Sequence, residues 1–262
     1  MHALVAAWCD AIESFQSTVS ELPDEAFTQQ SLLPGWTIGD IVAHVVALEV
    51  ELGGEGLPAH EPDWDALPHA DDLFSRYTEI GVDFRRGRSP AQLRTELADA
   101  ARIRTEQLVE GPQDMDHMVT GPGGIERTLG RVLGMRTFDV FLHGLDVRDA
   151  AGMPPPVLGA AARATADQMA GGLGFVWVKK AGAQSGDVLH FVVPEWIDAW
   201  IGVGQDGRGR SVEPGEATTT VTMAPMNYLR LGSGRRGDPA EVDVQGRRDL
   251  GQAVVAGLNV AP

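Results

Sequence analysis

The chain has 262 residues, 43% of them hydrophobic, which is enough to form one large globular domain or two ordinary ones. Its formal net charge of −16 argues against binding to nucleic acid or to an anionic membrane surface. Cys9 is the single cysteine, which excludes a disulfide framework and a multi-cysteine zinc site, and no segment looks like a secretory signal or a membrane span, so we expect a cytoplasmic protein.

The first half of the sequence predicts helices. Thr37, with Asp40 three residues later, forms a predicted capping box, and Ser89 before Pro90 is a second predicted N-cap. Gly152, followed by prolines, ends the last helix of this half. Apolar residues recur with helical spacing at residues 3–20, 38–52, 70–86, 90–110 and 127–150. Helices of this kind, joined by connections of unequal length, favour a four-helix bundle.

The spacing of apolar residues changes in the second half of the sequence. Residues 157–178 predict one more helix, whose glycines weaken its C-terminal part. Beyond residue 185, short β-favouring runs bounded by Gly, Asp and Pro predict strands, with a hairpin turn at residues 205–207. Two short helical stretches interrupt these strands, a pattern that is typical of a small α+β domain. We therefore expect a helix-bundle domain, a connecting helix or linker, and an α+β domain, at residues 1–152, 153–184 and 185–262.

An ionisable stripe lies within the predicted helix at 127–150. Arg136, Asp139, His143 and Asp146 are spaced so that they share one helical face, beside an apolar face. A solvated polar face explains such a stripe without any function. An alternative is a metal clamp, because a carboxylate and an imidazole one helical turn apart can bind the same ion.

His44 provides the second part of this hypothesis. It lies among apolar residues in "GDIVAHVVALEV", so its side chain is expected to point away from water, either as a buried histidine with one hydrogen bond or as a metal ligand. One imidazole from a neighbouring helix would complete a three-ligand site with Asp139 and His143. Three protein ligands leave one position open, as in catalytic zinc sites, and an open site can hold a thiol as thiolate.

Three stretches resemble a known family. "LLPGWTIGDIVAHVVALE" at residues 32–49 and "GMRTFDVFLHGLDVRDAAG" at residues 134–152 are similar to the two signature helices of the mycothiol-dependent maleylpyruvate isomerase family, whose N-terminal part is a DinB-like metal-binding four-helix bundle. The run "ATTTVTMAPMNYLRLGSGRRGDPAEVDVQGRRDLGQAVVAG" is similar to its second domain, a sterol-carrier-like α+β module. The resemblance thus implies a two-domain protein, with a helical bundle followed by a small α+β domain.

The resemblance also implies a metal and a thiol. A divalent ion, usually zinc, would be held by His44, Asp139 and His143, and would bind the thiol of mycothiol for addition to an electrophilic substrate. Asp146 would orient His143 or cap local backbone groups. The carboxylate of the family is generally a glutamate, and Asp139 is one methylene shorter. The helix must therefore approach more closely, the aspartate must bind through water, or the site must be weaker.

The expected reaction is thiol S-transfer or a maleylpyruvate-type cis–trans isomerisation. A dianionic substrate would need an arginine, and Arg230, Arg247 and Arg248 are candidates that could equally be surface charges. The expected partners are a low-molecular-weight thiol and a small electrophile, and the expected assembly is a monomer or homodimer. Two alternatives are a metal-dependent hydrolase and a non-catalytic ligand-binding or interaction protein on the same scaffold.

Overall fold

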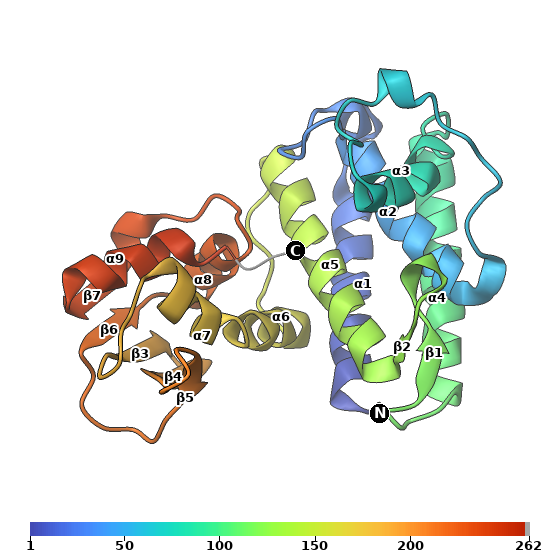
Figure 1. Cartoon of the computed structure of the whole chain (residues 1–262). Helices are drawn as coiled ribbons and strands as arrows, with labels where there is room; N and C mark the ends of the chain where they lie inside the picture. The colour runs from blue at the N-terminus through green and yellow to red at the C-terminus, as the bar shows by residue number, and fades with distance from the viewer. Residues whose placement is uncertain (260–262) are drawn as a thin grey trace. The chain divides into compact units, whose positions relative to one another are not determined.

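The computed structural model describes residues 1–259, and the chain divides into two compact units. The first is Met1–Ala161 and the second is Ala162–Pro262, of which the last three residues lie outside the described part. Figure 1 shows a helical first unit and a second unit that combines a sheet with helices. This agrees with the helical and α+β halves that the sequence predicts, and the two units are described separately below.

Long helices form the first unit, close to where the sequence predicts them. They are α1 (Ala3–Glu21), α2 (Ile38–Val50), α3 (Leu73–Asp83), α4 (Pro90–Glu110) and α5 (Leu129–Ala150). In Figure 1, α1 runs along both α4 and α5, and α2 packs against α3, α4 and α5. The ionisable stripe on α5 therefore faces a neighbouring helix, and α2 brings His44 into the same interior.

The predicted capping boxes are both present. The Thr37 side chain accepts a hydrogen bond from the backbone N–H of Asp40, whose carboxylate accepts one from the Thr37 N–H in return. Ser89 and Gln92 form the same reciprocal pair at the start of α4, with Pro90 in its first turn. Each box satisfies backbone donors that the first helical turn cannot, so both helix starts are fixed by local sequence.

Shorter elements connect the long helices. α2 continues into a wider π-type turn at Glu51–Glu55, and the loop before α5 pairs β1 (Met118–Thr120) with β2 (Glu126–Thr128) as an antiparallel hairpin. Single 3-10 turns form at Asp24–Thr28, Trp64–Ala66 and Pro122–Gly124. The sequence predicts that α2 ends at residue 52. For the loop before α5 it predicts extended backbone but not a paired hairpin.

The core of the first unit is built on the inner faces of these helices. Its largest fully buried side chains include Trp8 and Phe15 on α1, Ile41 on α2, and Leu142 on α5. Phe15 lies between α1 and α5, where it lines a small gap with Val140 and Phe141. Apolar packing therefore holds α5 against the rest of the unit on both sides of its ionisable stripe.

The second unit begins differently from the prediction. Instead of one helix over 157–178, the structure has α6 (Ala160–Ala170), a short α7 (Leu173–Phe175) and a π-type turn at Val176–Lys180. Gly171 and Gly172 form the turn that ends α6, and Gly174 packs directly against the backbone of Gly209. Glycine weakens a helix interior and permits this close backbone approach, which explains why the single long helix is wrong.

A five-stranded sheet forms the body of the second unit, in the order β5-β4-β3-β6-β7. The strands are β3 (Val188–Val193), β4 (Ile197–Val203), β5 (Gly209–Ser211), β6 (Thr219–Thr222) and β7 (Asp243–Gly246). All neighbours are antiparallel except β3 and β6, which pair in parallel from Leu189 opposite Thr219. The turn predicted at residues 205–207 joins β4 to β5, with Gly207 at a φ of 69°.

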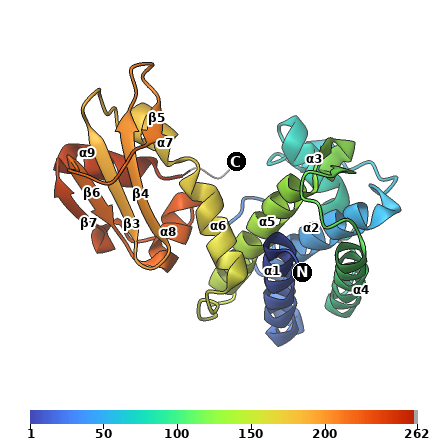
Figure 2. The ribbon, with the colours of Figure 1, turned by 90° about the horizontal axis from the view of Figure 1, so that it is seen from below.

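Helices pack on this sheet. Burial alternates along β3, where Leu189, Phe191 and Val193 are fully buried and the residues between them are not, as expected for a sheet with one covered face. α8 (Pro225–Gly232) contributes Tyr228, which makes an edge-on ring contact with Phe191, and α9 (Arg248–Gly257) packs on β6 and β7. Figure 2 shows α8 and α9 beside the strands.

Within residues 1–259, none of the helices combines the length and the apolar character needed to cross a bilayer.

The packing of α1 on α5 can be tested by its contribution to stability. Phe15 is 1% exposed, so Phe15→Ala should lower the free energy of unfolding of the first unit by about 3–5 kcal/mol, because the cavity adds to the lost burial. Phe74 is 69% exposed, and Phe74→Ala should change that free energy by no more than about 0.5 kcal/mol. Urea denaturation followed by circular dichroism compares the two variants, and equal losses would contradict this account of the core.

Candidate metal centre

His44, Asp139 and His143 meet inside the first unit. Each offers one possible ligand atom, and these atoms all lie within 4.8 Å of one another. The Nε2 atom of His44 is 3.3 Å from Oδ2 of Asp139, and Nε2 of His143 is 3.5 Å from Oδ1 of the same carboxylate. The imidazole centroids are 4.8 Å apart and meet edge to face. The sequence analysis predicts this grouping, and the structure brings the three side chains together.

The donor atoms fit a metal ion. Nε2 of His44, the nitrogen that faces Asp139, is buried and forms no hydrogen bond with any described residue, which is costly for a polar atom unless something else satisfies it. Two imidazoles and one carboxylate are a donor set that zinc binds. The side chains of His44 and His143 are 5% and 12% exposed, whereas that of Asp139 is 31% exposed. A small molecule could therefore reach the cluster from the side of Asp139.

Asp146 fixes the orientation of His143. Its Oδ2 lies 3.1 Å from Nδ1 of His143, one helical turn further along α5. A carboxylate at Nδ1 favours a proton on that nitrogen, so Nε2, which faces Asp139, is the nitrogen left to bind a metal. Asp146 is thus placed where an outer partner of a ligating histidine belongs, which is one of the two roles that the sequence analysis left open.

A buried set of charges lies next to the cluster. Arg136 donates from Nη1 to Oδ2 of Asp139 at 2.6 Å, and from Nε and Nη2 to Oε1 of Glu49 at 3.0 and 2.9 Å. Glu49 is fully buried, and its Oε2 lies 3.6 Å from Nε of Arg104 on α4. The indole of Trp8 donates to the same Glu49 carboxylate at 3.3 Å. Residues from α1, α2, α4 and α5 therefore converge behind Asp139.

These neighbours set the protonation of the cluster. Burial lowers the pKa of His44, only partly opposed by Asp139, so this imidazole is neutral and able to bind a metal. Burial would raise the pKa of Asp139, but Arg136 and the two histidines hold it well below its usual range. Burial also acts to lower the pKa of His143, but Asp139 and Asp146 outweigh it and raise the pKa to about 9. In the metal-free protein His143 therefore carries a proton that a metal would displace.

Trp36 forms one wall of the cluster. Its ring centroid is 5.0 Å from that of His44 and 6.1 Å from that of His143. The indole N–H donates to Glu79 on α3 at 2.8 Å, and the Glu79 carboxylate lies 3.1 Å from His69. Gly35 precedes Trp36 at a φ of 76°, and a Cβ there would overlap the His69 ring. The loop before α2 thus needs this glycine to place the tryptophan.

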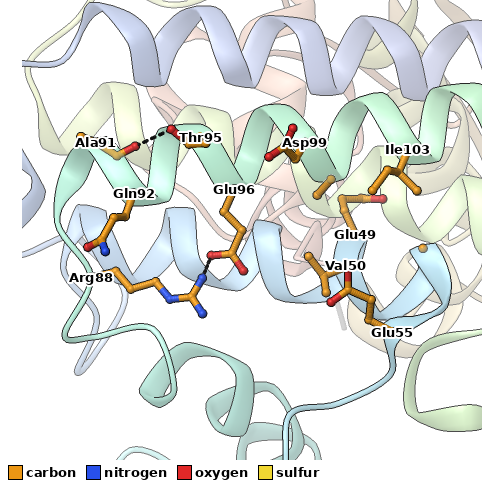
Figure 3. A pocket seen from close by; sticks show the side chains of 12 residues that line it. Glu49, Val50, Glu55, Arg88, Ala91, Gln92, Thr95, Glu96, Asp99 and Ile103 are labelled. Atoms are coloured by element: carbon orange, nitrogen blue, oxygen red, sulfur yellow. Dashed lines mark hydrogen bonds and ion pairs between the residues drawn. The ribbon is translucent and has the colours of Figure 1, made fainter.

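A groove of about 540 Å³ lies between α2 and α4, on the other side of Glu49. Figure 3 shows acidic side chains along it, including Glu55, Glu96 and Asp99, with Arg88 paired to Glu96. The three residues of the candidate metal centre do not line this groove. Its charged residues are explained as the solvated edge of two packed helices, and Arg88, in the loop before α4, pairs with Glu96 of α4 itself.

The arginines that the sequence analysis singled out lie in the second unit. Arg230 is at the end of α8 and donates to the backbone oxygen of Arg236 at 3.2 Å. Arg247 precedes α9 and donates to Asp187 at 3.3 Å and to Asp249 at 2.7 Å. Arg248 is exposed at the start of α9 and lines a groove of about 730 Å³ within that unit. Their part in binding a substrate carboxylate stays a prediction.

Sequence reasoning missed several residues around the cluster. Glu49 carries a signal, because it is a lone charge five residues after His44 in an apolar stretch of α2. Arg104 and Glu79 lie on helices whose sequences are polar along much of their length, so nothing local distinguishes them from solvated residues. Trp36 lies in a loop, and its approach to His44 depends on the long-range contact with Glu79.

The comparisons with known proteins identify a family and a fold. Residues 8–148 match the family described as "Mycothiol maleylpyruvate isomerase N-terminal domain". The fold is similar to two crystal structures, of the mycothiol-dependent maleylpyruvate isomerase and of a histidine-to-alanine mutant of it, with TM-scores of 0.56 and 0.58. Both are 18% identical to this chain, and each alignment covers 94% of this chain and 93% of the other. No curated protein matches the chain significantly.

The charge state of His143 predicts that the folding stability of the metal-free protein depends on pH. The folded-state pKa is about 9, above the unfolded value of about 6.5, so this group stabilises the fold fully below about pH 6.5 and loses that effect as the pH rises through about 9. Thermal unfolding should be measured across this pH range with a chelator present. The unfolding temperature of the wild type should fall as the pH rises, and that of His143→Asn should depend less on pH. Parallel profiles for the two proteins would contradict the assignment.

Proposed function

The chain belongs to the family described as the mycothiol maleylpyruvate isomerase N-terminal domain, and from this membership we propose that it is a metal-dependent enzyme that activates a low-molecular-weight thiol for addition to a small electrophile. The cosubstrate we propose is mycothiol, and the metal we propose is zinc. The observation on which the proposal rests is the cluster of His44, Asp139 and His143, whose donor atoms lie within 4.8 Å of one another.

Each side chain of the centre has a defined part. His44 and His143 would hold the metal through Nε2, and Asp139 through a carboxylate oxygen. A divalent metal bound there lowers the pKa of a thiol, so that the thiolate is available at neutral pH. Asp146 keeps the Nδ1 proton of His143 in place and so directs Nε2 toward the centre. Trp36 covers one side of the two imidazoles and excludes water there.

The chemistry of a thiolate leads to two related outcomes. Addition of sulfur to an activated alkene forms a carbon–sulfur bond and turns the double bond into a single bond that can rotate. If the thiol is then expelled, the double bond re-forms in the other geometry, and the enzyme is a cis–trans isomerase. If carbon instead takes up a proton, the adduct persists, and the enzyme is a thiol S-transferase. Isomerisation consumes no thiol, whereas transfer consumes one thiol for each product formed.

The remaining parts of the protein have proposed roles as well. We assign the helical unit to the DinB-like four-helix bundles and the second unit to the sterol-carrier-like α+β modules. Arg230 and Arg247 are the proposed contacts for a substrate carboxylate, since a guanidinium binds a carboxylate with two parallel hydrogen bonds. A monomer or homodimer in the cytoplasm is the proposed working form.

Metal binding is the first test of this proposal. Elemental analysis of the untagged protein should find about one zinc per chain, as expected of a three-ligand centre with one open position. His44→Ala and His143→Ala should each lose the metal, because two remaining ligands bind it weakly. His117→Ala is the matched control, since His117 is an exposed histidine of the same unit, and it should keep the metal. Wild-type protein without metal after incubation with zinc would overturn the proposal.

Thiol dependence is the second test. Turnover of a maleylpyruvate-type substrate by the zinc-loaded protein should require added mycothiol, and His143→Ala should lose at least about a hundredfold in rate because the thiol is no longer activated. The amount of free thiol after the reaction distinguishes isomerisation from transfer. Turnover at the same rate without any thiol would contradict the proposal and favour a hydrolytic enzyme.

A further inference from the structure

We propose that Arg136 is a positioning residue that holds the Asp139 carboxylate in the orientation of a metal ligand, and that Glu49 holds Arg136 in place for this role. The inference rests on the proposed function, because it concerns the metal centre made by His44, Asp139 and His143. It goes further by assigning a role to a buried ion pair that does not itself face the metal.

The geometry of Arg136 supports this role. Its guanidinium uses one edge, Nε and Nη2, for Oε1 of Glu49 at 3.0 and 2.9 Å, and the third nitrogen, Nη1, for Oδ2 of Asp139 at 2.6 Å. The arginine side chain is 3% exposed, so no water competes for these donors. Because the guanidinium is planar and rigid, fixing one edge on Glu49 also fixes the direction in which Nη1 points.

The contact restricts the orientation of the Asp139 carboxylate. Oδ2 accepts the hydrogen bond from Arg136 and lies 3.3 Å from Nε2 of His44, which leaves Oδ1 3.5 Å from Nε2 of His143. An aspartate has a short side chain, so a small rotation would move Oδ1 out of reach of an ion that the two histidines hold. Restricting that rotation therefore keeps the carboxylate within reach of such an ion.

The charges of the group also fit this role. The negative charges of Glu49 and Asp139 are balanced by the positive charges of Arg136 and Arg104, with which they form ion pairs. A buried arginine without a partner would be strongly destabilising, so Glu49 is needed for Arg136 to remain at this position. The role of Glu49 is thus indirect, through the arginine that it binds.

Arg104 supplies a matched control within the same cluster. It is buried, like Arg136, and it pairs with the other oxygen of the same Glu49 carboxylate at 3.6 Å. Its Nη1 donates to the backbone oxygen of Leu52 and to the side chain of Gln107, and none of its hydrogen bonds or ion pairs reaches Asp139. An Arg→Lys change at either position removes one guanidinium from Glu49, but only the change at Arg136 also affects Asp139.

The test compares zinc affinity in Arg136→Lys and Arg104→Lys. Zinc competition with a chromophoric chelator should show affinity falling by about ten- to a hundredfold in Arg136→Lys, the usual effect of losing a hydrogen-bond partner of a metal ligand. The visible spectrum of the cobalt-substituted protein should change in Arg136→Lys as well. Arg104→Lys should keep wild-type zinc affinity and the wild-type spectrum, even if thermal unfolding shows that it is less stable.

Glu49→Gln provides a second variant in case Arg136→Lys fails to fold. It keeps the volume of the side chain but weakens its hold on Arg136, so zinc affinity should fall in the same direction by a smaller factor. Wild-type affinity in both Arg136→Lys and Glu49→Gln would overturn the inference, as would equal losses in Arg136→Lys and Arg104→Lys. A wild-type protein that binds no zinc would instead overturn the proposed function, and this inference with it.

Discussion

The carboxylate of Glu49 is the constraint on which the helical unit depends. It is fully buried on α2, and its partners come from three other helices, Trp8 on α1, Arg104 on α4 and Arg136 on α5. A buried charge is tolerated only when it is paired, and removing one partner of such a pair typically costs about 3–5 kcal/mol. The packing of these helices is therefore specified by charge as well as by apolar contact. The same arrangement brings Asp139 to the position where it meets His44 and His143.

The neighbours of each ionisable side chain in the site set its protonation or its orientation. His44 is neutral because it is buried, Asp139 is ionised because Arg136 is beside it, and His143 is oriented by Asp146. The result is a compact set of donors in which the carboxylate is partly exposed and Trp36 lies beside the two imidazoles. Such a set suits a metal that must bind a small ligand in an open position, which is the basis of the proposed thiol chemistry.

Much of this could be predicted from the sequence because it depends on local spacing. The helical period places Asp139, His143 and Asp146 on one face of α5, and the capping box of Thr37 and Asp40 fixes the start of α2. Features that depend on distant contacts could not be predicted. The glycines indicate a weak end for the helix predicted at 157–178, but not that Gly174 packs against the backbone of Gly209. Likewise, Trp36 lies beside His44 with its indole bonded to Glu79 on a different helix.

X-ray absorption at the zinc edge, with and without mycothiol, tests the central claim most directly. Without thiol, the account predicts only nitrogen and oxygen neighbours at about 2.0–2.2 Å, from two imidazoles, one carboxylate and one solvent ligand. With thiol, one sulfur neighbour should appear at about 2.3 Å. A shell of light atoms that mycothiol leaves unchanged would contradict thiol activation at this centre, even if the protein binds zinc.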